Sequence, residues 1–307
     1  MSPADFPHLG LAYGHGIVGN IRARPWLILA VPLFLWRFRR AAMKSDADVV
    51  HAHWLAAGAV AATLRRPFLV QVWGTDVALA RRVPWLARWI FRRARVVVAA
   101  SDYLAGEARA LGAREVRVVP SAVVIPSAVG DSDDPPHVLY VGRLSPEKGI
   151  EEFLRATGGL PRVIVGAGPV RVPESVGAVR PAELGAYYER AAVVCVPSRR
   201  EGYGMVAREA MAYGRPVVAT PVGGLVDAID DGMNGLLVGA QGLRGAIERL
   251  LADAELRARL GAAAREKARR EWSADTAATS LVGIYSDVRF ATAQTESPNG
   301  SGSASRR

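Results

Sequence analysis

The chain has 307 residues, of which 50% are hydrophobic and 22% are charged, and its formal net charge is +10 at pH 7. This length predicts two domains, and each half is long enough to bury its own core, as in a soluble globular protein. The single cysteine, Cys195, excludes an internal disulfide framework and fits a reducing compartment. Because Cys195 lies in an apolar strand pattern, we expect it to be packed and inert.

The positive charge favours polyanionic partners, which include nucleic acid, anionic lipid and phosphorylated substrates. Charge alone does not choose among these three. No recognised nucleic-acid-binding motif accompanies the charge, so we predict no nucleic-acid partner. Phosphorylated substrates and an anionic membrane surface stay open as partners.

The first apolar stretch, Trp26 to Trp36, falls short of the roughly 18 apolar residues that cross a membrane. It also starts too far into the chain for a signal peptide and lacks a small-residue cleavage site after it. Two readings stay open: a buried helix kinked at Pro32, or an interfacial helix on an anionic membrane. Both keep the protein cytoplasmic, and the second places it on the inner face of the cell membrane. The flanking basic residues are Arg22, Arg24, Arg37, Arg39 and Arg40.

Four short strand patterns follow, separated by helix-like stretches. This alternation predicts an α/β fold with a parallel sheet covered by helices. Ser101 is a suitable N-cap for the helix after the third strand, and Gly112 is a suitable stop. The strand patterns are Asp48 to His51, Phe68 to Trp73, Arg95 to Ala100 and Val116 to Val119.

The segment from Gly130 to Pro136 is acidic, rich in proline and without periodicity, which is typical of a linker. We therefore predict a first domain over residues 1–130, a linker over 131–136 and a second domain over 137–270. A last helix is expected over 271–290. Residues 291–307 are polar and rich in Ser and Gly, so we expect a disordered tail there.

The second domain begins with the strand pattern HVLYVG and a turn that carries Arg143 and Lys148. Two cations at one strand end suit a diphosphate, because an arginine can bind two oxygens in a fork and a lysine acts as a point charge. The next strand ends in Gly166-x-Gly168. Arg171 holds the place of the third glycine of a dinucleotide-binding fingerprint, which argues against a dehydrogenase.

The stretch from Val193 to Val238 contains the most informative pattern: an apolar strand, a glycine-bearing turn and a helix that starts near Gly204. Gly202 and Gly204 leave backbone N–H groups accessible at the helix start, where an anion binds favourably. Glu201 and Glu209 bracket the turn, and eight residues of helical rise would separate them by about 12 Å. Two ionised carboxylates at this spacing would accept hydrogen bonds from the polyol ends of a nucleotide-linked sugar.

The run from Glu201 to Glu209 matches the E-x7-E signature of the retaining glycosyltransferases of family 4. The surrounding PSRREGYGMVAREAMAYGRPVVATPVGGL and DGMNGLLV resemble that family closely, and VGRLSPEKGI, from Val141 to Ile150, resembles its other donor-side motif. The resemblance covers the second half of the chain. It implies the GT-B architecture, in which two Rossmann-like parallel-sheet domains face a cleft.

The resemblance further implies transfer of a sugar from a nucleoside-diphosphate sugar to a hydroxyl of a glycan or lipid-linked acceptor, such as a cell-envelope polysaccharide. Retention of the anomeric configuration and independence of a cofactor are expected. Arg143 and Lys148 would meet the charge on the leaving phosphate, Glu201 would hold sugar hydroxyls near the reacting carbon, and Glu209 would bind the ribose. The other donor-binding candidates are Gly142, Gly202, Tyr203, Gly204, Met205 and Val206.

Two Asp-x-Asp triplets occur, at Asp46 to Asp48 and at Asp131 to Asp133. A triplet of this kind binds the metal in a different class of glycosyltransferase. Here one triplet lies in the linker and the other precedes a strand, so we interpret both as chance and predict no catalytic metal.

In the first domain, DADVVHAHW and LVQVWGTDV resemble the family's acceptor-domain blocks. Strand ends in such sheets face the ligand crevice, so we expect acceptor contacts from His15, His53, Thr75 and Asp76. Many members carry a histidine where this chain has Trp73. Members also begin with a strand and a Gly-Gly loop that nothing here matches, so we expect the first domain to be truncated.

A non-catalytic nucleotide-sugar-binding or scaffold protein derived from this fold is the alternative function. It is favoured by Trp73 and by the unmatched start of the first domain. The sugar, the base and the acceptor stay open at this stage.

Overall fold

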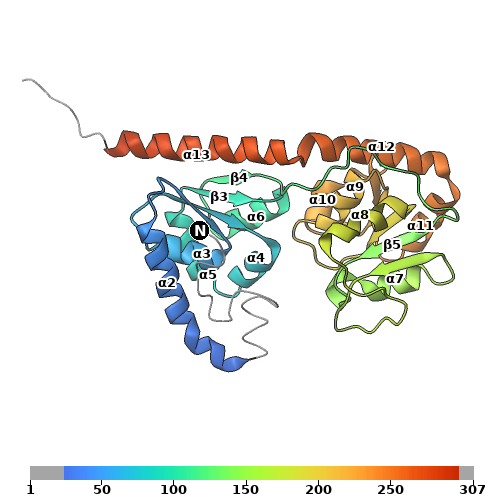
Figure 1. Cartoon of the computed structure of the whole chain (residues 1–307), viewed down its shortest axis with the longest axis horizontal. Coiled ribbons are helices and arrows are strands. Elements are labelled where there is room, and N and C mark those ends of the chain that lie inside the picture. Colours follow the sequence, from blue (N-terminus) through green and yellow to red (C-terminus); the bar gives the residue numbers. More distant parts are fainter. Residues whose placement is uncertain (1–23, 297–307) are drawn as a thin grey trace, which may run out of the picture.

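A computed structural model of the chain describes residues 24–296, with side chains as far as Phe290. The described residues form two parallel β-sheets, one before and one after the predicted linker in the chain, and helices lie against both (Figure 1). The predicted α/β class with two parallel-sheet domains is therefore confirmed.

The first sheet has the strand order β1-β2-β3-β4, and each neighbouring pair is parallel. Its core joins strand residues such as Val70 and Val97 to helix residues such as Ile90. The second, third and fourth predicted strands are confirmed to within one residue at each end, whereas the first lies two residues further along the chain, at Val50–His53. Asp48 precedes it and is exposed and paired with Arg289. The elements of this part of the chain are η2 (Pro25–Ala30), α2 (Val31–Lys44), β1 (Val50–His53), α3 (Leu55–Ala61), β2 (Phe68–Val72), α4 (Gly74–Ala80), α5 (Pro84–Arg93), β3 (Val96–Ala99), α6 (Asp102–Ala110) and β4 (Val116–Val118).

The predicted ends of α6 are confirmed by the capping geometry. The side chain of Ser101 accepts a hydrogen bond from the backbone N–H of Leu104, at 3.3 Å, and so satisfies one donor of the first turn. The helix ends at Ala110, and Gly112 follows with a φ of 95°, a conformation in which glycine commonly ends a helix.

The second sheet has the strand order β6-β5-β7-β8-β9, again with parallel neighbours. Alternate residues of β7 enter different cores: Val194 packs in one cluster, and Val193 and Cys195 pack in another. Both faces of the sheet are thus buried, which explains its near-continuous apolar strands. Burial raises the pKa of the Cys195 thiol well above its usual value, so this side chain is packed and inert, as predicted.

The remaining strands and helices all follow the predicted linker. They are β5 (Val138–Val141), η3 (Pro146–Lys148), α7 (Ile150–Ala156), β6 (Arg162–Val165), α8 (Pro181–Arg190), β7 (Val193–Val196), α9 (Met205–Ala212), β8 (Val217–Ala219), α10 (Gly224–Ala228), β9 (Gly235–Leu237), α11 (Leu243–Ala252), α12 (Ala254–Glu271) and α13 (Ala274–Glu296).

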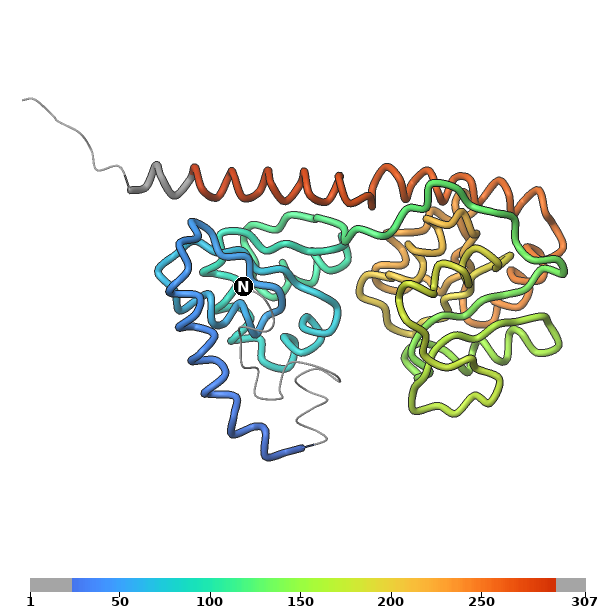
Figure 2. Tube along the Cα trace, viewed as in Figure 1, coloured from blue at the N-terminus to red at the C-terminus, as the bar shows by residue number. Residues whose placement is uncertain are grey.

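The last helix returns to the first domain. Figures 1 and 2 show α12 along the second domain and α13 continuing over the first. Ile284 and Val288 of α13 are buried against strand residues of the first sheet, among them Leu69 and Val98. The helix thereby joins the two domains by a second connection besides the segment between β4 and β5.

The predicted end of this helix at Phe290 is wrong. The helix continues to Glu296, so residues 291–296 are helical rather than part of a tail. No glycine or proline interrupts the chain between Ile284 and Ser297, and the first such residue is Pro298. Each added residue therefore gains another backbone hydrogen bond. The rest of the predicted tail, 297–307, lies outside the described residues.

The apolar stretch from Trp26 to Trp36 is not the buried, kinked helix of the first reading. Pro32 stands in the first turn of α2, where its missing N–H costs nothing and no kink is needed. In η2 and α2 only Leu27 is buried. Within residues 24–296, none of the helices is both long and apolar enough to span a membrane.

The packing of α13 on the first sheet predicts that substitution by alanine destabilises the protein much more at Ile284 than at Val282. Ile284→Ala should cost about 2–4 kcal/mol of unfolding free energy, because it leaves a cavity against Leu69 and Val98. Val282→Ala, on the exposed side of the helix, should change stability little. Urea denaturation of both variants measures the difference, and equal losses would contradict this packing.

Candidate functional site

The predicted strand–turn–helix lies in the second domain. β7 ends at Val196, and α9 begins at Met205 after Gly204, whose φ is 82°. The first N–H groups of α9 have no intrahelical acceptor, and they stand at the positive end of the helix dipole. Residues 201–204 form a turn rather than helix, so the estimate of about 12 Å between Glu201 and Glu209, which assumed helix throughout, does not apply.

Lys148 and Glu201 meet beside this turn. Lys148 Nζ lies 2.7 Å from Glu201 Oε2, and Ser198 Oγ donates to the same oxygen at 3.3 Å. Gly149 makes the contact possible, since its φ is 70° and a Cβ there would stand 1.8 Å from the carbonyl oxygen of Pro197. Only glycine lets the backbone after Lys148 approach the turn after β7 so closely.

A small cavity of about 30 Å³ lies at these strand ends. Its lining includes Gly142, Lys148, Ser198, Glu201 and Val206. The volume is about that of one water molecule. The structure therefore brings together candidates from both donor-side motifs of the sequence.

Arg143 does not join this pair. Its guanidinium pairs with Glu147 at 3.0 Å, and 61% of the Arg143 side chain is exposed. The backbone beside it is held instead, because Tyr140 Oη donates to the carbonyl of Arg143 at 3.0 Å. An exposed ion pair of this kind is worth about 1 kcal/mol or less, so Arg143 can turn to a ligand at little cost.

Glu209 is held by a tyrosine that the sequence did not point to. Tyr188 Oη donates to Glu209 Oε2 at 2.7 Å. Burial raises the pKa of Glu209, and the hydrogen bond from Tyr188 acts in the opposite direction. Tyr188 lies on α8, 21 residues earlier in the chain, and a single tyrosine in a helix carries no pattern that would reveal this contact.

Arg208 holds the turn before α9 through hydrogen bonds to backbone carbonyl groups. This buried side chain donates through Nη1 to the carbonyl oxygens of Tyr203 and Gly224, the latter at 3.2 Å. Its guanidinium also lies 3.8 Å from the centre of the Tyr203 ring, and Tyr203 Oη donates to the carbonyl of Ser121 at 2.6 Å. The side chain of Tyr203 is thus buried and structural, and the predicted donor contact from its backbone stays a prediction.

On the first-domain side, His53 lies at the end of β1 in a row of stacked rings. Its ring centre is 4.4 Å from that of His51 and 6.5 Å from that of Trp73. His51 Nδ1 also lies 2.7 Å from Tyr285 Oη on α13. Burial and then the neighbouring His53 lower the pKa of His51 to about 4, so this ring is neutral at pH 7. His53 is exposed, and burial lowers its pKa too.

The carboxylate of Asp76 holds the backbone in place at the ends of β1 and β2. Its buried carboxylate accepts backbone N–H groups of Trp73 at 2.6 Å, of Leu55 at 3.2 Å and of Val77 at 3.0 Å, and so ties the ends of β1 and β2 together. Burial raises the pKa of Asp76 to about 6 against these hydrogen bonds. Thr75 beside it is exposed. The fourth candidate, His15, lies outside the described residues.

Trp54 is an unpredicted feature of the same strand ends. It has a φ of 76°, the single positive value among non-glycine residues of the described chain, and it is exposed. Its backbone N–H donates to the carbonyl of Gln71 at 3.0 Å. Backbone strain of this kind is concentrated at functional sites. Nothing in the sequence around Trp54 signals this conformation.

The two domains meet at the predicted turn. A Cβ built on Gly74, at the start of α4, would stand 2.9 Å from the Cα of Gly202. Ser101 Oγ donates to the carbonyl of Gly202 at 3.3 Å, and the N–H of Tyr103 donates to the carboxylate of Asp227 at 2.9 Å. The turn beside Glu201 therefore lies against the strand-end loops of the first domain.

The Asp-x-Asp triplets have ordinary ion-pair partners. Asp133 pairs with Arg190 at 2.9 Å, and Asp48 pairs with Arg289 at 3.2 Å. In the part of the chain that the structure describes, no three His, Cys, Asp or Glu side chains gather as a potential metal site.

The sequence matches two protein families, one in each half. Residues 135–253 match the family described as "Glycosyl transferases group 1", and residues 5–122 match "Glycosyl transferase 4-like domain". A D-inositol 3-phosphate glycosyltransferase of Acidothermus cellulolyticus is 32% identical over 330 aligned positions, which cover 84% of this chain and 72% of that protein. A protein of the same name from Corynebacterium aurimucosum is 40% identical over 182 positions, which cover 49% of this chain and 43% of that protein.

The fold has known counterparts as well. A sucrose-phosphate synthase from Thermosynechococcus elongatus superposes with a TM-score of 0.74 and 25% sequence identity, over 88% of this chain and 80% of that one. This likeness confirms the expected GT-B architecture. Since the sequence agreement extends over most of the chain and over more than two thirds of the Acidothermus protein, the chain belongs to the group 1 glycosyltransferases.

Proposed function

We propose that this glycosyltransferase moves a sugar from a nucleoside-diphosphate sugar to a hydroxyl of a glycan or lipid-linked acceptor, with retention at the anomeric carbon and without a catalytic metal or cofactor. The observation that carries the proposal is the contact of Lys148 Nζ with Glu201 Oε2, 2.7 Å apart, beside the start of α9. A cation for phosphate, a carboxylate for sugar hydroxyls and helix-start amides lie together there.

In the proposed reaction, the bond between the anomeric carbon and the diphosphate oxygen breaks, and its electron pair stays on that oxygen. The sugar gains oxocarbenium character. Lys148, Arg143 and the first N–H groups of α9 stabilise the negative charge as it develops. Arg143 turns away from Glu147 to do so, and Lys148 passes from Glu201 to the phosphate. Glu201 is then able to accept hydrogen bonds from the sugar hydroxyls.

Retention follows if the acceptor hydroxyl attacks from the side on which the leaving group departs. A double displacement would instead need a carboxylate nucleophile. Among the described residues that line the small cavity, Glu201 is the one carboxylate, and it is already assigned to the hydroxyls. Front-side attack, with the acceptor proton passing to the departing phosphate oxygen, is therefore the mechanism we propose.

The acceptor is proposed from family and charge. A cell-envelope glycan or a lipid-linked sugar suits a basic chain that works in the cytoplasm at the inner face of the membrane. Both relatives described above carry the name D-inositol 3-phosphate glycosyltransferase, so D-inositol 3-phosphate belongs in the acceptor panel.

The second candidate function is a protein that binds nucleotide sugars without turning them over. It is favoured by Trp73, whose place many members of the family fill with a histidine. Donor binding without hydrolysis or transfer to any acceptor of the panel would select this alternative.

Removing either member of the central pair should abolish most transfer. Lys148→Ala and Glu201→Gln should each lower kcat/KM by roughly 10²- to 10³-fold, because each loses a contact to the transition state. Glu248→Gln, which breaks an exposed ion pair with Arg244 on α11, is the matched control and should keep full activity. Circular dichroism checks folding, and full activity in both site variants would place the reaction elsewhere.

Nucleotide affinity should fall as the pH falls through the raised pKa of Glu209, because protonation removes the acceptor for the ribose hydroxyls. Tyr188→Phe deletes a hydrogen bond that lowers this pKa, so the midpoint should move to higher pH. Glu209→Gln should flatten the profile. Isothermal titration calorimetry with the nucleoside diphosphate measures these changes.

The neighbouring Tyr187→Phe is the control for this titration and should leave the midpoint where it is. A midpoint that Tyr188→Phe leaves unchanged, or moves to lower pH, would argue against the assigned role of Glu209.

The anomeric configuration of the product should equal that of the donor. Proton NMR of the first product, recorded before any mutarotation or secondary hydrolysis, reports the configuration through the coupling between the protons on the first two sugar carbons. An inverted product would rule out the front-side mechanism while leaving the donor site intact.

A further inference from the structure

The exposed apolar surface of the first domain is concentrated on η2 and α2. Trp26 is 63% exposed, Leu29 is 81% exposed and Trp36 is 53% exposed. α2 has no buried residue at all, and η2 buries only Leu27. A continuous element with so many large apolar side chains in water is a sign of an interaction surface.

The charge on this element has one sign. No Asp or Glu occurs from Arg24 to Lys44, whereas Arg39, Arg40 and Lys44 are exposed on α2. Arg40 lies over the ring of Trp36, with its guanidinium carbon 5.4 Å from the ring centre. Tryptophans and cationic groups thus lie on the same exposed element, with the cations gathered after Trp36, and helices at a lipid interface carry this combination.

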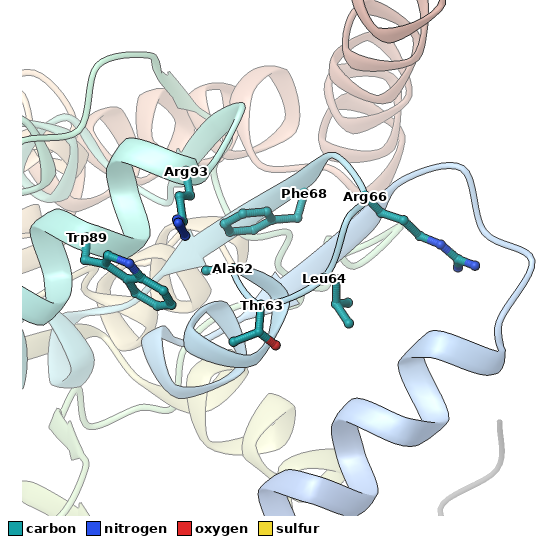
Figure 3. A pocket seen from close by; sticks show the side chains of 7 residues that line it. All are labelled: Ala62, Thr63, Leu64, Arg66, Phe68, Trp89 and Arg93. Atoms are coloured by element: carbon teal, nitrogen blue, oxygen red, sulfur yellow. The ribbon is translucent and has the colours of Figure 1, made fainter. Parts of the chain in front are cut away.

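A groove continues this surface towards α5. It has a volume of about 490 Å³, and Figure 3 shows Trp89 and Arg93 of α5 on one side of it and Arg66 on the other, with α2 beyond. Arg39 of α2 donates through Nε to Thr63 Oγ1, at 3.1 Å, on the groove lining. Basic side chains of α2 and of α5 therefore lie at the same groove.

The second helix repeats the pattern of the first. From Arg81 to Arg95 the chain again contains no Asp or Glu. Trp85 at the start of α5 is 70% exposed, and Arg93 lies 4.9 Å from the ring centre of Trp89. Tryptophan beside arginine, on a chain segment without Asp or Glu, thus occurs on both sides of the groove.

These features select among possible occupants. A second copy of the chain would bring Arg39, Arg40 and Lys44 against their own equivalents with no carboxylate between them, and like charges repel. Nucleic acid would satisfy the arginines but would leave Leu29 and its apolar neighbours in water. An anionic bilayer satisfies both, since its headgroups carry phosphate and its interface accepts apolar side chains.

We propose that η2, α2 and the groove beside α5 form a membrane-docking surface for anionic phospholipid. Trp26, Leu29 and Trp36 enter the boundary between headgroups and acyl chains, while the arginines along α2 and at the groove bind lipid phosphates. The inference deepens the proposed membrane localisation by naming the surface and the lipid chemistry. It does not depend on glycosyl transfer.

The test is cosedimentation of the full chain with vesicles of phosphatidylcholine alone or mixed with phosphatidylglycerol. Binding should require phosphatidylglycerol and should weaken with salt. Arg40→Gln/Lys44→Gln should lower the partition coefficient by roughly 30-fold. Leu29→Ser/Trp36→Ser should abolish the binding that persists at high salt. Val226→Ser/Met233→Ser, exposed apolar positions of the second domain, are the matched control and should bind as wild type.

Equal binding to both vesicle types, no binding, or binding unaffected by Leu29→Ser/Trp36→Ser would overturn the proposal. So would a dimer in light scattering that Leu29→Ser/Trp36→Ser dissolves, because the surface would then be covered by a second copy. Nucleotide-sugar hydrolysis, measured without vesicles, tests the proposed function separately. A protein that hydrolyses the donor but does not bind vesicles would contradict the docking surface alone.

Discussion

The position of Glu201 is fixed by backbone packed against backbone. A Cβ on Gly223, before α10, would stand 1.7 Å from the carbonyl oxygen of Glu201, and one on Gly74 would stand 2.9 Å from the Cα of Gly202. No side chain fits at either point, so the turn is held from both sides by main chain. Because the backbone of Glu201 is fixed in this way, its carboxylate is already positioned close to Lys148. This rigidity is what preorganised electrostatic catalysis requires.

The central ion pair also explains how one site can receive an anion beside a carboxylate. Without donor, Lys148 neutralises Glu201, whose side chain is only 13% exposed and would otherwise be poorly solvated. A nucleotide sugar offers each partner a replacement: a phosphate for the lysine and hydroxyls for the carboxylate. Neither charge is then left unpaired when the donor binds. Arg143, held outside the pair by the weak contact with Glu147, adds a second cation at little cost.

The features predictable from sequence are those set by neighbours in the chain. The Ser101 cap, the strand before Pro197 and the helix after Gly204 depend on a few adjacent residues. The contact of Tyr188 with Glu209 and that of Gly74 with Gly202 join distant segments and leave no local pattern. The same reason explains why the sequence left two interpretations of residues 26–36 open, because apolar periodicity indicates a helix but does not reveal whether anything covers it.

The two connections between the domains lie side by side, which limits how the site can open. The N–H of Val123, in the segment after β4, donates to the carbonyl of Trp272, at the end of α12, at 3.0 Å. Trp272 is buried in the second domain, whereas Ile284 of α13 is buried against the first sheet. A rotation about the junction at Ser273 would therefore separate Gly202 from Gly74 while leaving both packed faces intact. The side chain of Tyr285, which is hydrogen-bonded to His51, would move with the first domain. Opening the site would therefore cost the polar contacts at Gly202 and Asp227 and the packing of Tyr203, which is buried in the core cluster of the first domain.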